Sequence, residues 1–134
     1  MDIYAQNILD RYKNPFHKDK KIHETISHKE ANHSCGDIVT VKLSEDGMKI
    51  IDYSYAGNGC AISMAASDMI GDLIINMTTD QILELSKDDL FELLGIEISL
   101  RRSKCALLSL LALQNGILIS LDKPTRNWTY YHLS

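Results

Sequence analysis

The apolar positions of the chain follow a strand period in its first half and a helical period in its second half. Residues 38–44 alternate between apolar and polar side chains, and the turn pair Asp46-Gly47 follows. A second alternating segment, residues 49–56, comes after the turn and places Ile51 on its apolar face. Alternation on both sides of an Asp-Gly pair is typical of a β-hairpin. A weaker pattern at residues 22–26 predicts one more short strand.

Helical spacing predicts the elements on either side of this hairpin. Residues 2–12 carry aromatic and aliphatic side chains four apart and end before Asn14-Pro15, because a residue that precedes proline avoids helical angles. Residues 61–77 form a predicted amphipathic helix with Asp68 and Asp72 on its solvent face.

The last third of the chain also reads as helical. A short helix is expected near residues 79–85, and Ser86 with Asp89 three residues later resembles a capping box that opens another. The final helix, about residues 99–115, is apolar nearly all round and is expected at the centre of the fold, with Gly116 as its natural end. Residues 122–134 form a tail without a predicted structure.

Composition narrows the class of protein. The chain has 134 residues, 45% of them hydrophobic, and a formal net charge of -4, which suits one domain and gives no sign of a nucleic-acid or membrane partner. The first residues lack a basic-then-apolar signal region, so a cytoplasmic location is expected. Three cysteines in a reducing compartment cannot all pair within the chain, which favours metal binding or thiol chemistry.

Each cysteine lies in surroundings that favour a thiolate or a metal-bound sulfur. Cys35 and Asp37 flank Gly36 at the start of a predicted strand, so their side chains are expected on the same side. Cys60 precedes a helix, whose N-terminal amides favour thiolate over thiol. Cys105 lies near the start of the last helix beside three cations that would also favour its thiolate, Arg101, Arg102 and Lys104.

These groups could supply one tetrahedral metal site with three thiolates and one carboxylate: Cys35, Asp37, Cys60 and Cys105. Zinc and iron both accept thiolate, and a carboxylate in the fourth place makes the site easier to open. The alternative is that each cysteine is simply a small buried apolar residue. No C-x-x-C pair is present in the sequence to decide between the two interpretations.

Four segments of the chain together resemble a known family. They are Tyr12-Lys13-Asn14-Pro15, Ser34-Cys35-Gly36-Asp37, Gly57-Asn58-Gly59-Cys60-Ala61-Ile62-Ser63 and Arg102-Ser103-Lys104-Cys105-Ala106. In this order they are similar to the U-type iron-sulfur scaffold proteins, which comprise IscU, SufU and the N-terminal domain of NifU.

The resemblance implies an α+β fold of the SufE/NifU-like kind, with helices packed on a small antiparallel sheet of about three strands. Residues 1–121 would form the scaffold domain and residues 122–134 a tail. The resemblance also implies that the four ligands converge on zinc or iron, or on a transient [2Fe-2S] cluster. The expected partners are a cysteine desulfurase (SufS/IscS/NifS-like), a downstream cluster carrier or SufBCD-like complex, and a second copy of the chain.

Two subtypes of the family differ at positions that can be checked here. IscU-like proteins carry His before the last cysteine, where this chain has Lys104, and a Leu-Pro-Pro-Val-Lys motif, where it has Gly95-Ile96-Glu97-Ile98-Ser99. The run Arg102-Ser103-Lys104-Cys105 looks like SufU. SufU proteins, however, usually carry an insert before the last cysteine, and the span from Cys60 to Cys105 is too short to hold it.

Three functions follow from these observations. The first is a scaffold that accepts sulfur at Cys35 and holds a nascent cluster, with Arg102 steadying the negative charge of the sulfur. The second is a zinc-dependent sulfurtransferase that relays sulfur without building a cluster. The third is a structural zinc protein without sulfur transfer. His33 could replace a ligand during transfer, although an exposed loop position is more usual, and His17 is expected at the surface.

Overall fold

A three-stranded antiparallel sheet forms the base of the fold. The computed structural model describes residues 3–133. Its strands are β1 (Ile26–Asn32), β2 (Asp37–Asp46) and β3 (Lys49–Asn58), in the order β1-β2-β3. This sheet, covered by helices, confirms the predicted α+β class. The strand expected at residues 22–26 was misplaced, because pairing with β2 begins only at Ile26.

Within residues 3–133, five α-helices and two short 3-10 helices complete the fold. The α-helices are α1 (Ile3–Lys13), α2 (Ala61–Ile74), α3 (Thr79–Glu84), α4 (Lys87–Leu94) and α5 (Ser103–Ser120), and the 3-10 helices are Leu100–Arg102 and Trp128–Tyr131. The predicted capping box of Ser86 and Asp89 opens α4, and Thr78 with Gln81 forms a second one at α3. Each box satisfies backbone N–H groups that the first helical turn leaves free.

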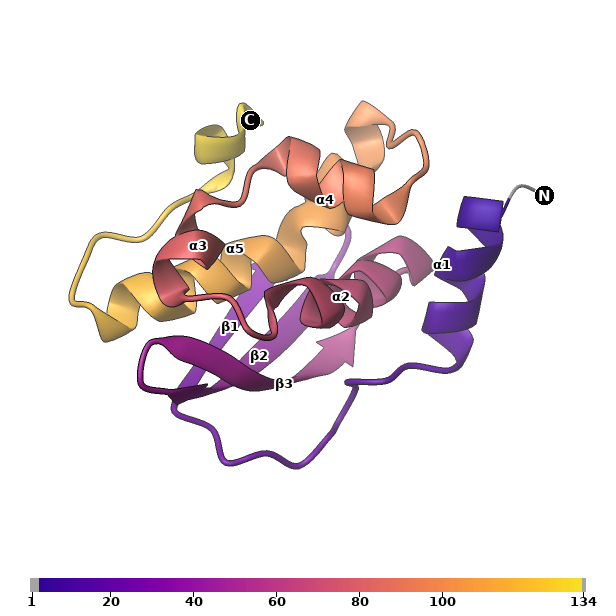
Figure 1. The fold of residues 1–134 in the computed structure, drawn as a ribbon. Helices are drawn as coiled ribbons and strands as arrows, with labels where there is room; N and C mark the ends of the chain where they lie inside the picture. Colours follow the sequence, from indigo (N-terminus) through magenta and orange to yellow (C-terminus); the bar gives the residue numbers. More distant parts are fainter. Residues whose placement is uncertain (1–2, 134) are drawn as a thin grey trace.

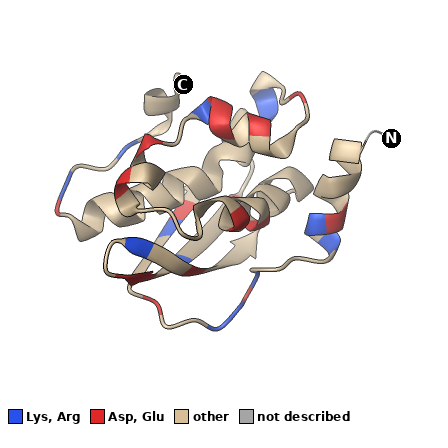
Figure 2. Cartoon of the chain, viewed as in Figure 1, with Lys and Arg blue, Asp and Glu red and all other residues tan. Residues whose placement is uncertain are grey.

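Two helices cover one face of the sheet. Figure 1 shows α2 and α5 side by side above the strands, with α5 against β1 and β2 and α2 against β3. The inward side chains Val39, Val41 and Leu43 of β2 are almost fully buried beneath them. In the view of Figure 2, Lys and Arg are interspersed with Asp and Glu along the ribbon.

A bulge in the hairpin overturns the predicted orientation of Ile51. Ser44 pairs with Asp52 and Glu45 pairs with Ile50, which leaves Ile51 without a cross-strand partner. One extra residue in a strand reverses the alternation of its side chains beyond that point. Ile50 is therefore fully buried, whereas Ile51 is 53% exposed.

Helix α5 runs through the glycine that was expected to end it. Gly116 lies inside the helix, where an added Cβ would come within 3.0 Å of the Cβ of His28 on β1. The glycine therefore serves close packing of helix on strand rather than termination. Residues Leu100–Ser120 form the one described helix that is long and apolar enough to cross a membrane, but 83% of its apolar window is buried inside the fold, which is the arrangement of a core helix.

The tail packs on the rest of the domain. Tyr131 and Leu133 are buried, and the hydroxyl of Tyr131 donates to the side-chain oxygen of Gln114 in α5. The side chain of Asn115 bonds both the backbone N–H and the carbonyl of Arg126, at 2.7 and 3.0 Å. Buried amides on α5 thus provide the polar partners that hold the tail.

The N-terminal helix is held by the carboxylate of Asp68, which the sequence pattern predicted to face solvent. Asp68 is completely buried, and it accepts hydrogen bonds from the Arg11 guanidinium (2.7 Å) and from the backbone N–H groups of Phe16 and His17. His17 is also buried, contrary to prediction, and its Nε2 lies 2.8 Å from Asp72 Oδ1. The solvent-face assignment was wrong for Asp68 because its partners lie more than 50 residues away in sequence.

Replacing Arg11 should loosen this attachment. Arg11→Met keeps an unbranched apolar stem but removes the guanidinium that forms the ion pair with the buried Asp68. Because removing one partner of a buried ion pair leaves a charge uncompensated, we expect a loss of about 2–4 kcal/mol in the free energy of unfolding, measured by urea denaturation. Lys13→Met, at an exposed position of the same helix, is the matched control and should have little effect. Equal stability of both variants would contradict this assignment.

Candidate metal centre

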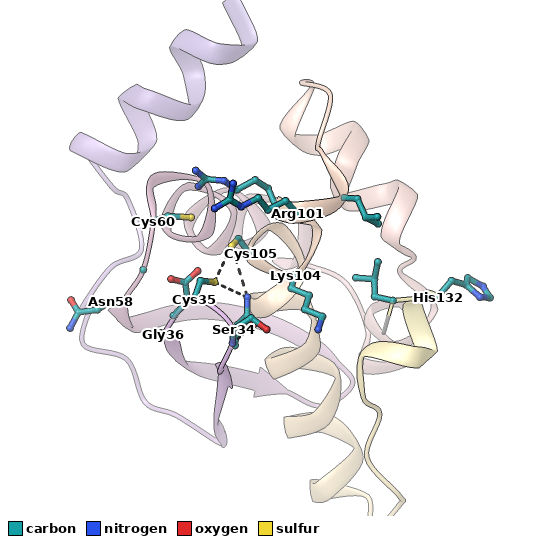
Figure 3. A pocket seen from close by; sticks show the side chains of 15 residues that line it. Ser34, Cys35, Gly36, Asn58, Cys60, Arg101, Lys104, Cys105 and His132 are labelled. Atoms are coloured by element: carbon teal, nitrogen blue, oxygen red, sulfur yellow. Dashed lines mark hydrogen bonds between the residues drawn. The ribbon is translucent and has the colours of Figure 1, made fainter.

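Three of the four predicted ligands meet at one end of the sheet. The ligand atoms of Cys35, Asp37 and Cys105 all lie within 4.8 Å of one another. The sulfur atoms of Cys35 and Cys105, which are 70 residues apart in sequence, are separated by 3.3 Å. Cys35 comes from the turn between β1 and β2, Asp37 from the first position of β2, and Cys105 from the first turn of α5 (Figure 3).

A tight turn, rather than an extended strand, brings Cys35 and Asp37 together. The carbonyl of Asn32 accepts hydrogen bonds from the N–H groups of Cys35 (3.3 Å) and Gly36 (2.9 Å). Gly36 has a φ of +76°, in the left-handed region that favours glycine. The predicted proximity is therefore present, but its cause differs from the same-side geometry of a strand. Gly36 contributes its backbone conformation rather than its lack of a side chain, because an added Cβ would meet nothing within 4 Å.

Asp37 presents an unsatisfied oxygen to this cluster. Its side chain is only 4% exposed, and Oδ2 is buried without a hydrogen-bond partner among the described residues. A Cβ on Gly59 would lie 3.0 Å from the Asp37 carboxyl carbon and 2.8 Å from Ser63 Oγ, so the glycine makes room for the carboxylate. A buried carboxylate oxygen without a partner is costly unless a cation or donor satisfies it. With two thiols beside it, this donor set fits zinc or iron.

Cys60 borders the same cavity but stands apart from the three clustered ligands. It is the N-cap of α2, and its sulfur accepts a hydrogen bond of 3.4 Å from the N–H of Ser63. This confirms its predicted place at a helix start. Its side chain points into the cavity in Figure 3. The structure thus brings Cys35, Asp37 and Cys105 together and leaves Cys60 beside them.

The surroundings of Cys105 differ from the prediction. Burial raises the pKa of its thiol, and the hydrogen bond with Cys35 and the charges of Cys60 and Asp37 act in the same direction. The neighbouring cations do not offset this. The ammonium of Lys104 lies over the Trp128 ring at 5.9 Å, and Arg101 and Arg102 are exposed. The expectation that these cations favour the Cys105 thiolate was therefore wrong.

The cysteines open onto a cavity of about 1000 Å³ with a basic wall. Arg101, Arg102 and Lys104 line it together with Leu100, which is 84% exposed. The predicted site residue Arg102 therefore faces the cysteine cavity. His33 is exposed and is absent from the described lining. His132 reaches the far wall, where Figure 3 shows its ring directed away from the cysteines.

Sequence reasoning missed one residue of this site. The side-chain nitrogen of Asn32 lies 2.9 Å from Cys35 Sγ and 4.0 Å from Cys105 Sγ. Asn32 is also the cross-strand partner of Asp37. In the sequence, the only indication was an uncharged amide three residues before a cysteine. This spacing does not predict a contact with the sulfurs unless the pairing of β1 with β2 is known.

Comparison with known proteins places this chain in a family. The model of the NifU-like N terminal domain matches residues 3–126. A protein of Bacillus subtilis named zinc-dependent sulfurtransferase SufU is 31% identical over an alignment of 132 residues. The match covers 86% of this chain and 89% of that protein. A protein of Streptococcus pyogenes named iron-sulfur cluster assembly scaffold protein IscU is 34% identical over 88 residues, covering 63% of this chain and 52% of that one.

Solved structures share the fold. A putative iron-sulfur cluster assembly scaffold protein for the SUF system from Fervidobacterium islandicum is 28% identical, with a TM-score of 0.66 over 86% of this chain and 96% of that one. The N-terminal part of a NifU-like protein from Brucella abortus is 21% identical, with a TM-score of 0.71 over 91% and 96% of the two chains, and this likeness concerns the fold alone. Because the family model spans nearly all of the described domain, the chain belongs to the family of NifU-like N-terminal domains.

Proposed function

We propose that this protein is a scaffold for iron-sulfur cluster assembly that accepts sulfur from a cysteine desulfurase. The observation that carries the proposal is the meeting of three ligand atoms from three separate elements. One of them belongs to a buried carboxylate that has an oxygen without a hydrogen-bond partner in the described part of the chain. The family membership and the functions stated in the names of the related SufU and IscU proteins support it. A downstream cluster carrier or SufBCD-like complex would receive the product.

The ligands assigned to the metal are Cys35, Asp37, Cys60 and Cys105. Zinc or iron bound there would hold the thiols as thiolates and leave the carboxylate as the ligand that exchanges most readily. Cys60 would complete the set by a change in its side-chain rotamer, giving up the bond from the Ser63 N–H. The transient [2Fe-2S] cluster is cargo on the same residues.

Exposure favours Cys35 as the sulfur acceptor. Cys35 is exposed, whereas Cys105 is 4% exposed and sits beneath it. The thiolate of Cys35 would attack the outer sulfur of the desulfurase persulfide. A new S–S bond then forms at Cys35, the S–S bond of the donor breaks, and the desulfurase cysteine leaves as a thiolate. The guanidinium of Arg102 on the cavity wall would hold the anionic persulfide.

A second function, sulfur relay without cluster assembly, is favoured by one specific comparison. The relative whose match extends over 89% of its own length is named a zinc-dependent sulfurtransferase. This chain also carries Lys104 before its last cysteine, as in the SufU-like pattern. Both functions use the same residues, so only the product of the reaction separates them.

Gly59→Ala should weaken metal binding by displacing Asp37. The new methyl group would occupy the space 3.0 Å from the Asp37 carboxyl carbon, and we expect zinc affinity to fall by about 10–100-fold in a competitive chelator titration. The loss should persist in a Ser63→Ala background, which removes the second close contact. Asn58→Ala, on the same cavity wall, is the control. Unchanged zinc affinity in Gly59→Ala would argue against Asp37 as a ligand.

Cys35→Ser should abolish persulfide formation on the protein. After incubation with a desulfurase and cysteine, mass spectrometry should find the added sulfur atom on Cys35 of the wild type and none on the variant, because the exposed nucleophile is gone. Ser34→Ala, one residue away in the same turn, should be loaded like the wild type. If the variant carried persulfide on Cys60 instead, the acceptor assignment would be wrong.

The product distinguishes scaffold from relay. Protein purified without oxygen should be analysed for metal and visible absorption before and after incubation with iron, cysteine and a desulfurase. A scaffold should gain cluster absorbance that Cys60→Ser and Cys105→Ser each lose, because both thiolates are assigned as cluster ligands. A colourless protein that retains zinc and gains only persulfide would instead establish the relay.

A further inference from the structure

We propose that Asn32 is a positioning residue of the metal centre, whose carboxamide NH₂ donates to the sulfurs of Cys35 and Cys105 and holds both toward the bound ion. This role rests on the proposed function, because it acts on two of the assigned ligands. Asn32 lies outside the four motifs of the family resemblance, and its contacts with both cysteines are visible only in the folded chain.

The position of Asn32 gives it access to both sulfurs at once. Its side-chain nitrogen lies 2.9 Å from Cys35 Sγ and 4.0 Å from Cys105 Sγ, and these two sulfurs are 3.3 Å apart (Figure 3). The residue is 2% exposed, so water competes little for its N–H groups. A carboxamide carries two N–H donors, one for each sulfur.

The remaining polar atoms of Asn32 fix its orientation. The side-chain oxygen accepts a hydrogen bond of 3.3 Å from the Ser34 N–H, which leaves the nitrogen facing the sulfurs. The backbone carbonyl bonds the N–H groups of Cys35 and Gly36, and the residue pairs with Asp37 across the strands. One residue therefore contacts the turn that carries Cys35, the strand that carries Asp37 and the sulfur of Cys105.

A donor in this place would change the metal centre itself as well as the shape of the turn. Hydrogen bonds to a charged sulfur are stronger than those between neutral groups, and they withdraw electron density that the sulfur would otherwise share with the metal. Loss of the N–H groups should weaken binding, because the two sulfurs lose the group that orients them and stabilises their negative charge. It should also lower the energy of sulfur-to-metal charge transfer, because the electron density on the sulfurs rises. A residue that only supported the fold would not shift the charge-transfer energy.

Cobalt(II) is the probe, because its bonds to thiolate absorb light. Asn32→Leu keeps the approximate size of the side chain without polar atoms, and Asn32→Ala removes the same donors without adding bulk. Asn58→Leu makes the matched change at an exposed position on the same cavity wall. Each protein is titrated with cobalt(II) without oxygen, its charge-transfer band is recorded, and its folding is checked by urea denaturation.

The expected result is cobalt(II) affinity about 10–100-fold lower in both Asn32 variants, with the band moved to lower energy, and no change in Asn58→Leu. Wild-type affinity and band energy in Asn32→Leu would overturn the proposal, as would a loss of affinity with an unmoved band. Wild-type protein without any sulfur-to-cobalt band would overturn the proposed function, and the role of Asn32 with it.

Discussion

The packing of α5 across β1 and β2 is the constraint on which the candidate site depends. It places the first turn of the helix beside the turn that precedes β2, and so brings Cys105 within 3.3 Å of Cys35. The close approach requires Gly116, since a side chain there would meet His28 on β1. Two further residues of α5, Gln114 and Asn115, are buried with satisfied hydrogen bonds, so the helix is also fixed in rotation.

The site itself is asymmetric, and its asymmetry follows from this packing. The helix that carries Cys105 lies in the core, whereas Cys35 lies on a turn at the surface. Burial of a thiol disfavours its charged form, so the inner position suits a ligand held by a metal and the outer position suits a nucleophile that meets a partner. Asp37 is buried like Cys105, yet its Oδ2 has no hydrogen-bond partner among residues 3–133 and so remains available to a cation.

Local sequence patterns predicted the elements whose causes are local. The Asp46-Gly47 hairpin and the Ser86 capping box depend on residues within a few positions of one another, and both are present. The patterns failed where contacts with a segment distant in sequence determine the burial of a residue or the extent of a helix. Asp68 is buried because Arg11 and the Phe16 N–H bond to it from the N-terminal segment, more than 50 residues away in sequence. Gly116 lies within a helix because β1 packs closely against it. Helix propensity is a weak prior that tertiary packing overrides.

The same distinction explains what could be predicted of the candidate metal centre. Cysteine and aspartate are possible metal ligands wherever they occur, so the candidate ligands could be chosen from the sequence. The residue type of Asn32 does not indicate a role at a metal site, because the function of an amide depends on the groups that it contacts in the folded chain. Here it faces two sulfurs on one side and the Ser34 N–H on the other. The ligands of such a site are therefore easier to read from a sequence than the residues that orient them, and these require the fold.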